Sequence, residues 1–157
     1  MQIKLLAIGK TDDKNLQQLI DTYKKRLGFY CRFDFEIISD IKNVKNLSEI
    51  QQKQKEGDEI LKKIQKPDTL ILLDENGKNY SSIGFSEFLQ KKMNSGLKQL
   101  TFVIGGPYGF SQEIYSRANG KLSLSSMTFS HQMVRLFFIE QLYRGFTILK
   151  NEPYHHR

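Results

Sequence analysis

The sequence predicts an α/β protein in which a parallel sheet carries helices on both faces. Two observations lead to this fold class. Short apolar runs typical of buried strands alternate with segments whose apolar residues recur at helical spacing, and this alternation occurs five times along the 157 residues. No internal repeat, low-complexity tract or linker interrupts the alternation. We therefore expect one domain spanning residues 1–157.

The first half of the chain is expected to form two strand–helix units. Glycines follow the first strand and the first helix, where they would end each element. Ser48 and Gln51 have the spacing of a capping box, which marks the start of the second helix, and Pro67 marks its end. The expected elements are a strand at 3–8, a helix at 14–27, a strand at 33–38 and a helix from 48 to about 66.

The second half continues the alternation. Asn76-Gly77 is a typical turn pair, so the third strand is expected to end before it. The last helix is apolar nearly all round, which predicts burial on more than one side, within its own domain or against another subunit. The expected elements are strands at 69–74, 100–104 and 121–124, and helices at 85–94, after Ser111, and at 131–150.

Composition limits the possible functions. Lys and Arg number 24 against 17 Asp and Glu, and the net charge of +7 favours an acidic partner such as nucleic acid, although solubility alone is another reason for it. The single cysteine, Cys31, excludes an internal disulfide framework and a cysteine-rich zinc site, and it indicates an intracellular setting. The histidines lack partners at ligand spacing, so no metal is expected. No apolar stretch is long and uncharged enough for a membrane span.

Candidate binding segments follow three of the expected strands. In open α/β sheets, ligands bind beyond the carboxyl ends of the strands, here at Leu73-Asp74, 105–109 and 124–128. The glycine-rich loop 105–109 matches neither a P-loop nor the dinucleotide fingerprint, and Pro107 removes an N–H that an anion site would use. Close approach of its backbone to a flat, uncharged group such as adenine or ribose is one interpretation. A purely structural turn is the other.

Arg144 has two possible roles on the last helix. Its spacing from Glu140 is that of an i,i+4 ion pair, which stabilises a helix by only about 0.2–0.5 kcal/mol. The alternative is that an arginine on so apolar a helix faces a phosphate or a carboxylate.

Five segments of the chain together resemble one known family. They read FVIGGPYG, LSLSSMTF, HQMVR, EQLYR and PYH, at residues 102–109, 122–129, 131–135, 140–144 and 153–155. They are similar to the ribosomal RNA large-subunit methyltransferase H family, which belongs to the SPOUT superfamily of knotted methyltransferases. The resemblance extends over essentially the whole chain. Ser130 departs from it, because family members commonly have proline before the histidine.

The resemblance implies a fold, a cofactor and a reaction. The C-terminal part, about residues 70–157, would form a trefoil knot that binds the cofactor, although protein chains generally avoid knots. The cofactor implied is S-adenosyl-L-methionine, and the reaction is methylation at N3 of a pseudouridine in 23S ribosomal RNA. A cytoplasmic homodimer acting on the assembled ribosome is implied as well. Carried over by position, the cofactor contacts are Leu73, Gly105, Leu124, Ser125, Ser126, Met127, Thr128 and Phe129.

The catalytic residues expected on the acceptor side are Arg144, Tyr154 and His155. Methyl transfer to an imide nitrogen needs the acceptor in line with the methyl group and loss of the acceptor's proton. Arg144 suits the resulting anion or a phosphate, and either tail residue could position the base or relay its proton. Which of them is the general base stays open. Two alternative functions are a SPOUT methyltransferase acting on another RNA, such as tRNA, and a non-enzymatic RNA-binding or assembly factor.

Overall fold

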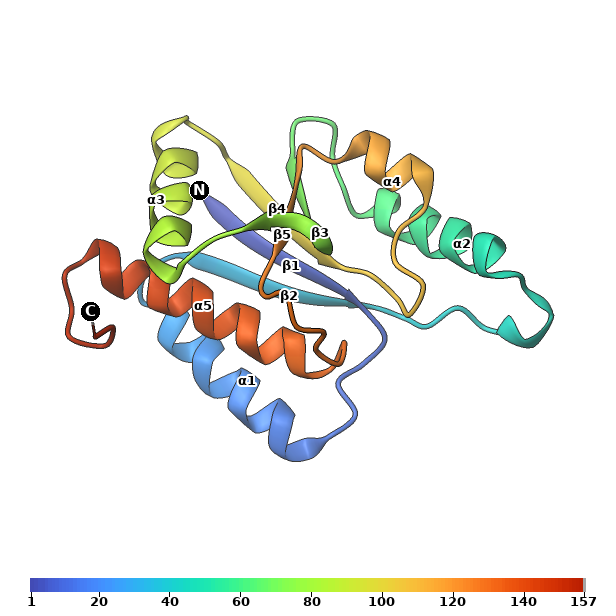
Figure 1. Cartoon of the computed structure of the whole chain (residues 1–157), viewed down its shortest axis with the longest axis horizontal. Coiled ribbons are helices and arrows are strands. Elements are labelled where there is room, and N and C mark those ends of the chain that lie inside the picture. The colour runs from blue at the N-terminus through green and yellow to red at the C-terminus, as the bar shows by residue number, and fades with distance from the viewer. Residues whose placement is uncertain (157) are drawn as a thin grey trace.

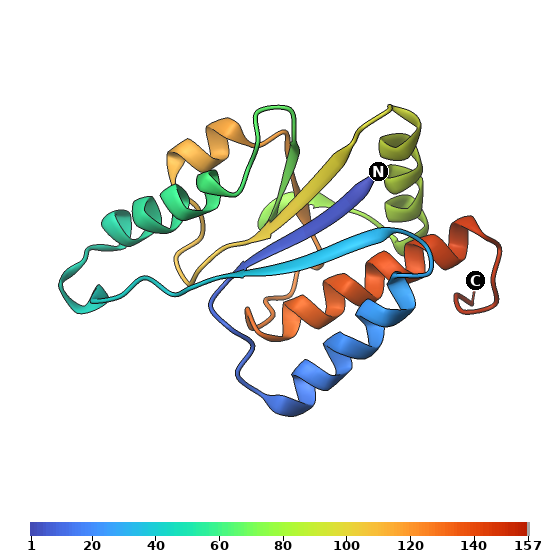
Figure 2. The ribbon, with the colours of Figure 1, turned by 180° about the vertical axis from the view of Figure 1, so that it is seen from behind.

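The computed structural model describes residues 1–156 and shows five parallel strands with helices on both faces, so the expected fold class is confirmed (Figures 1 and 2). Residue 157, the last of the expected domain, lies outside the described residues. In spatial order the strands are β2 (Arg32–Ile38), β1 (Gln2–Ile8), β4 (Gln99–Ile104), β3 (Thr69–Asn79) and β5 (Gly120–Ser123). Helices α1 (Lys14–Leu27), α3 (Ser82–Asn94) and α5 (Met133–Leu149) cover one face, and α2 (Glu49–Lys62) and α4 (Gln112–Arg117) cover the other.

The central strands are buried on both faces because successive side chains of a strand point to opposite sides. In β1, Ile3 and Leu5 pack beneath α1, α3 and α5, whereas Leu6 and Ile8 pack beneath α2 and α4. All four side chains are buried. This explains why the strand is a continuous apolar run in the sequence.

Side-chain caps set the starts of the helices. The capping box expected at Ser48 and Gln51 is confirmed, with the Ser48 hydroxyl accepting the Gln51 N–H at 3.1 Å. Ser81 accepts the Gly84 N–H, so α3 begins at Ser82, three residues earlier than expected. Helix α2 ends at Lys62 rather than near residue 66, and a 3₁₀ turn, η1 (Val44–Asn46), precedes it.

The expectation that Asn76-Gly77 forms a turn is wrong. Strand β3 continues through both residues, and Leu122 of β5 pairs with Leu73 and again with Lys78, on either side of an irregularity. A Cβ on Gly77 would lie 2.5 Å from the Leu122 nitrogen, so the glycine permits a close approach of two strands rather than a turn. The irregularity leaves residues 74–76 free to face the carboxyl edge of the sheet.

Helix α5 lies between α1 and α3 against the sheet. Phe138 and Leu142 are fully buried, and a Cβ on Gly145 would lie 2.9 Å from the Leu89 side chain of α3. The expectation that the last helix is buried on more than one side is therefore confirmed. None of the helices within residues 1–156 has the length and apolar character needed to cross a bilayer.

Candidate functional site

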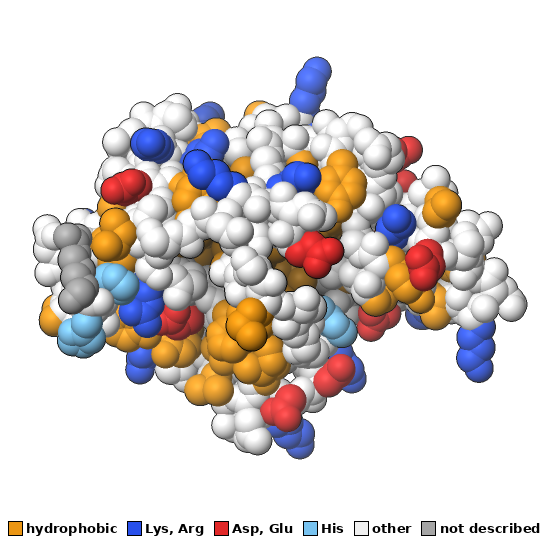
Figure 3. Space-filling model, in the orientation of Figure 1, with side chains coloured by type: hydrophobic (Ala, Val, Ile, Leu, Met, Phe, Trp, Pro, Cys, Tyr) orange, Lys and Arg blue, Asp and Glu red, His pale blue; other side chains and the backbone are white. Residues whose placement is uncertain are grey.

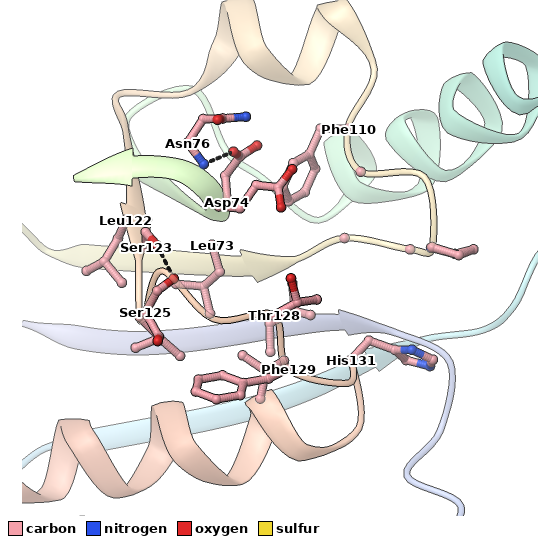
Figure 4. Close-up of a pocket in the computed structure, with 18 of the residues that line it drawn as sticks. Leu73, Asp74, Asn76, Phe110, Leu122, Ser123, Ser125, Thr128, Phe129 and His131 are labelled. Carbon is pink, nitrogen blue, oxygen red and sulfur yellow. Dashed lines mark hydrogen bonds between the residues drawn. The ribbon is translucent and has the colours of Figure 1, made fainter. Parts of the chain in front are cut away.

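A cavity of about 410 Å³ lies at the carboxyl ends of β3, β4 and β5 (Figure 4). Its walls are residues 73–76, 104–110 and 122–129, together with the start of α5, so the three strand-end segments selected from the sequence meet in one pocket. Ser126 belongs to the third segment but does not line the cavity. The other seven residues expected to contact the cofactor line the cavity: Leu73, Gly105, Leu124, Ser125, Met127, Thr128 and Phe129.

Hydrogen bonds hold the third wall of the cavity, residues 122–129, in a compact loop. The Ser123 hydroxyl donates to the Ser125 carbonyl at 2.9 Å, and the Ser125 hydroxyl accepts the Met127 N–H at 3.0 Å. Serine hydroxyls commonly stabilise such turns by bonding to nearby backbone groups. The loop thereby brings Thr128 and Phe129 to the cavity, on the side opposite Asp74 (Figure 4).

Contacts within the protein explain why the second wall of the cavity, residues 104–110, contains glycines. A Cβ on Gly105 would lie 3.1 Å from the Phe110 ring, and a Cβ on Gly106 would lie 2.0 Å from a Glu56 carboxylate oxygen. Gly109 has a φ of +81°, a conformation that other residues rarely adopt. These contacts favour the interpretation of loop 105–109 as a structural turn, although the turn also lines the cavity.

The pocket wall is acidic although the chain as a whole is basic. Asp74 and Glu75 line the cavity, and none of the described residues that line it is Lys or Arg. Asp74 is fixed because it accepts the Tyr115 hydroxyl at 2.5 Å and the Asn76 N–H at 2.8 Å. Burial and this bond to Asp74 raise the pKa of Tyr115 to about 12, so the phenol stays a donor. Of these two side chains, only Asp74 was expected at the site, as a strand end, and Tyr115 was missed.

Arg144, Tyr154 and His155 come together around Glu140, which was expected only as the partner of Arg144 in an ion pair. That i,i+4 pair is present, with Nε of Arg144 3.1 Å from the Glu140 carboxylate. The Tyr154 hydroxyl donates to the same carboxylate at 2.8 Å, and Nη1 of Arg144 lies 3.2 Å from Nδ1 of His155. Burial, with hydrogen bonds to Tyr23 and Glu140, raises the pKa of Tyr154. We call these four residues, Glu140, Arg144, Tyr154 and His155, the acceptor cluster.

The acceptor cluster does not reach the cavity of its own chain. Val134 lines the cavity, and Arg144 lies ten residues further along α5, which corresponds to about 15 Å. A second cavity of about 290 Å³ adjoins the first and is lined by Gln141 and by Glu140 of the acceptor cluster. The two cavities share four lining residues: Leu122, Ser123, Leu124 and Phe129.

An apolar patch lies beside the cavities. Met127 is 77% exposed, and Phe129, Met133 and Phe137 are each close to 40% exposed. The rings of Phe129 and Phe137 are in contact, with centroids 5.0 Å apart. Figure 3 shows hydrophobic side chains gathered on this side of the molecule. Met133 and Phe137 share one stripe of α5 with Glu140 and Arg144, because their positions recur at helical spacing.

Arg135 fixes the start of α5 from beneath the pocket. Its side chain is fully buried, and it donates to the Ile8 carbonyl at 2.8 Å and to the Thr11 hydroxyl and the His131 carbonyl at 3.1 Å. Burial lowers the pKa of Arg135, and the charge of Asp12 opposes this shift. The arginine thus ties His131, which lines the cavity, to the end of β1.

The histidines do not converge on one site. His131 lines the cavity, whereas His155 belongs to the acceptor cluster. In the described part of the chain, no group of three or more His, Cys, Asp and Glu side chains is arranged to hold a metal ion.

Comparisons with known proteins confirm the resemblance found in the sequence. The family model described as "Predicted SPOUT methyltransferase" matches residues 1–155. Proteins named "Ribosomal RNA large subunit methyltransferase H" from Flavobacterium johnsoniae and Christiangramia forsetii are 76% and 67% identical to this chain over the full length of both chains. The relative of that name from Porphyromonas gingivalis is 53% identical over 99% of each chain. The chain therefore belongs to the ribosomal RNA large subunit methyltransferase H family of SPOUT methyltransferases.

Proposed function

We propose that this methyltransferase transfers the methyl group of S-adenosyl-L-methionine to N3 of a pseudouridine in 23S ribosomal RNA on the assembled ribosome. The observation that carries the proposal is the cavity in which the three strand-end segments meet. The names of the relatives support ribosomal RNA as the substrate class. A ribosomal substrate would place the protein in the cytoplasm.

The residues around the cavity fit S-adenosyl-L-methionine. The cofactor carries a sulfonium and an ammonium against a single carboxylate, so it is a net cation, and Asp74 and Glu75 favour a cation electrostatically. A volume of about 410 Å³ lies within the range of small-molecule sites. Leu73 and Leu124 would offer apolar surface to the adenine. All of these residues lie within 70–157, the expected cofactor-binding region.

The acceptor cluster supplies the groups that the transfer needs. When bound, S-adenosyl-L-methionine supplies an electrophilic methyl group on its sulfonium. Arg144 would stabilise the anion that forms at N3 or hold a neighbouring phosphate. The raised pKa keeps the Tyr154 phenol protonated, so this residue would act as a hydrogen-bond donor that positions the base, and His155, whose Nδ1 faces the Arg144 guanidinium, would help to orient the acceptor.

In a homodimer, the cavity of one subunit and the acceptor cluster of the other would form a composite site. The shared stripe of α5 carries the apolar patch at its start and the acceptor cluster near its end. Antiparallel pairing of two such stripes about a twofold axis would cover Phe137 in both subunits. The same pairing would place each acceptor cluster beside the partner's cavity. We infer a dimer with two composite sites.

Sedimentation tests the dimer. Phe137→Asp should produce monomers at micromolar concentration because it places a charge in the centre of the buried surface. Phe29→Asp is the matched control, since Phe29 is 89% exposed on the turn after α1 and away from the patch. A wild-type protein that sediments as a monomer, or dimers that persist in Phe137→Asp, would contradict the inference.

Mixing two inactive variants tests whether the site is composite. Thr128→Trp is expected to fill the cavity, and Arg144→Ala removes the acceptor-side cation. In a mixed dimer, one site combines an intact cavity with an intact acceptor cluster from the other subunit. Random mixing should then restore about a quarter of wild-type activity, because half of the dimers are mixed and each has one intact site. No recovery would show that cavity and acceptor cluster act within one chain.

Cofactor binding is tested by calorimetry with S-adenosyl-L-methionine. The wild-type protein and Thr22→Trp, a control on the exposed side of α1, should bind it, and Thr128→Trp should not. If the wild-type protein binds RNA but has no affinity for the cofactor, the non-enzymatic alternative would be favoured.

Substrate choice is tested with three RNAs. The net charge of +7 gives phosphate attraction that salt weakens and that carries no sequence information. Recognition would therefore depend on the dimer groove and a pre-shaped target. Transfer of labelled methyl should be far faster on ribosomes than on protein-free ribosomal RNA. Equal rates would contradict this argument, and faster transfer to tRNA would favour the alternative RNA substrate.

A further inference from the structure

A row of aromatic rings joins the end of α1 to the acceptor cluster. The Arg26 guanidinium lies over the Tyr23 ring at 5.0 Å and over the Tyr143 ring at 5.9 Å, measured to the ring centroids. Tyr143 meets the Tyr154 ring edge-on at 4.7 Å, and the Arg144 guanidinium lies 4.7 Å from the centroid of Tyr154. Cations at these distances are attracted to a ring face. The row therefore has an arginine at each end.

Arg26 differs from Arg144 in having no acidic partner. Its side chain is exposed, and among residues 1–156 no ion pair includes it, whereas Arg144 pairs with Glu140. Contact with the rings restricts where the Arg26 guanidinium lies, so less freedom is lost when it binds a ligand. A planar guanidinium placed in this way is suited to binding a phosphate through two N–H groups.

The two carboxylates beside the row are already engaged. Glu140 accepts hydrogen bonds from Arg144 and Tyr154, and Glu152 accepts one from the Tyr30 hydroxyl. Figures 1 and 2 show how Glu152 reaches Tyr30, because the tail after α5 turns back towards the end of α1. Neither carboxylate is therefore free to neutralise Arg26.

The end of α1 is basic. Its last turn contains Lys24, Lys25 and Arg26, and Figure 3 shows basic and histidine side chains gathered at this end of the molecule. The acidic residue of α1, Asp21, is two positions from Tyr23 and so lies on the opposite side of the helix. This charge favours an anionic partner.

An exposed aromatic side chain lies at the same end. Phe29 follows α1 and is 89% exposed, more than any other large hydrophobic residue among residues 1–156. Its backbone is held in place, because its N–H donates to the Arg26 carbonyl and the Tyr30 ring packs on Tyr143 and Phe146. One exposed apolar residue needs no explanation by itself. Positive charge beside an exposed ring, however, is typical of surfaces that bind single-stranded nucleic acid.

We propose that Arg26 and Phe29 form a docking surface for an unpaired segment of ribosomal RNA that adjoins the target nucleotide. Arg26 binds a phosphate of this segment, and Phe29 stacks on one of its bases. Tyr143 contacts both Arg26 and Tyr154, so the docking surface and the acceptor cluster are one ring apart, a distance that a few nucleotides of one strand span. The inference rests on the proposed function, because it takes the acceptor cluster as the place of the target nucleotide.

Binding to unmethylated ribosomes at several salt concentrations tests Arg26. Arg26→Ala removes one phosphate contact, so affinity should fall and the slope of log affinity against log salt should become shallower by about 0.7. Arg26→Lys should keep the slope but bind more weakly than the wild type, because it loses the planar fork. Lys55→Ala is the control, since it removes the same charge from an exposed position of α2 on the other face of the sheet, and it should change neither quantity.

The same assay tests Phe29. Phe29→Ala should weaken ribosome binding about five- to hundredfold with no change in the salt slope, because it removes a stacking contact and no charge. Phe29→Trp keeps a flat ring and should bind like the wild type. Ile50→Ala is the control, since Ile50 is 65% exposed on α2, and it should have no effect.

Calorimetry and sedimentation separate docking from the other functions of the chain. Every variant should bind S-adenosyl-L-methionine and form dimers like the wild type, because Arg26 and Phe29 neither line the cavity nor belong to the apolar patch. Wild-type affinity for ribosomes in Arg26→Ala or Phe29→Ala would overturn the docking surface alone. Dissociation of the dimer in either variant would also overturn it, by assigning the surface to a contact between subunits. A wild-type protein that does not methylate ribosomes would overturn the proposed function, and this inference with it.

Discussion

Replacing Arg135 with lysine would separate charge from hydrogen-bond geometry at the start of α5. Arg135 is fully buried, and its three guanidinium nitrogens donate to three acceptors on different segments. Lysine keeps the positive charge but presents one compact ammonium group on a flexible stem. We expect that group to reach one of the three acceptors, leaving the other two without their donor.

The size of the effect follows from the lost bonds. A hydrogen bond from a charged donor contributes about 1.5–3 kcal/mol, so losing two should lower the free energy of unfolding by about 3 kcal/mol at the low end. For a chain of this size, that corresponds to a melting temperature about 6–12 °C lower. Arg144→Lys makes the same change on the same helix in a more exposed ion pair, and it should lower the free energy of unfolding by less than about 1 kcal/mol.

Urea unfolding followed by circular dichroism measures both variants, and equal m values would show that the comparison is valid. Arg135→Lys should also weaken S-adenosyl-L-methionine binding, because Arg135 holds the carbonyl of His131, a residue of the pocket wall. A loss below about 1 kcal/mol, or one no larger than that of Arg144→Lys, would refute the reasoning.

Three further predictions concern single sites. Gly77→Ala should lower the free energy of unfolding by about 1–3 kcal/mol in a denaturant titration, because its Cβ would press on Leu122, whereas Gly28→Ala at an exposed helix end should have little effect. Burial raises the pKa of Glu56, so its ionisation destabilises the fold only above pH 4.5, the ordinary value, and Glu56→Met should raise the melting temperature more at about pH 7.5 than at about pH 4. An equal gain at both pH values would contradict this. Burial raises the pKa of Cys31 from 9.0 to about 12, so a disulfide reagent at about pH 8 should react with the native thiol roughly a thousandfold more slowly than with the unfolded one, and similar rates would count against it.

The layered fold could be predicted from the sequence because its signals are local. Helical spacing, caps such as Ser48 and continuous apolar strands each need only a short window of sequence. The end of β3 could not be predicted in this way. Asn76-Gly77 has the residue types of a turn, but a glycine is required at position 77 because it lies against Leu122, which is 45 residues away in the sequence. The trefoil knot is likewise absent from any local pattern and stays a prediction from family membership.

The candidate site divides in the same way. The cavity could be predicted because strand ends of a parallel sheet meet at one edge. Glu56 and Arg135 could not, because charged residues on helices are ordinarily solvated, and only the packed structure shows that both are buried. The sequence also could not show that only the start of α5 lines the cavity, which leaves Arg144 about 15 Å further along that helix. The roles of Arg144, Tyr154 and His155 stay predictions.

The order of the strands has a consequence for how the protein is made. Strand β1 pairs with β4 at Gln2 and Gln99, and β3 has only β4 beside it until β5 emerges from residue 120 onwards. Contacts so distant in sequence form slowly, and synthesis delivers the N-terminal part first. A nascent chain that ends before β5 exposes Leu70, Ile71 and Leu72 on an unpaired edge, which is a template for aggregation. The pairing that covers this edge and the third wall of the cavity therefore both form only after the final segments of the chain have been synthesised.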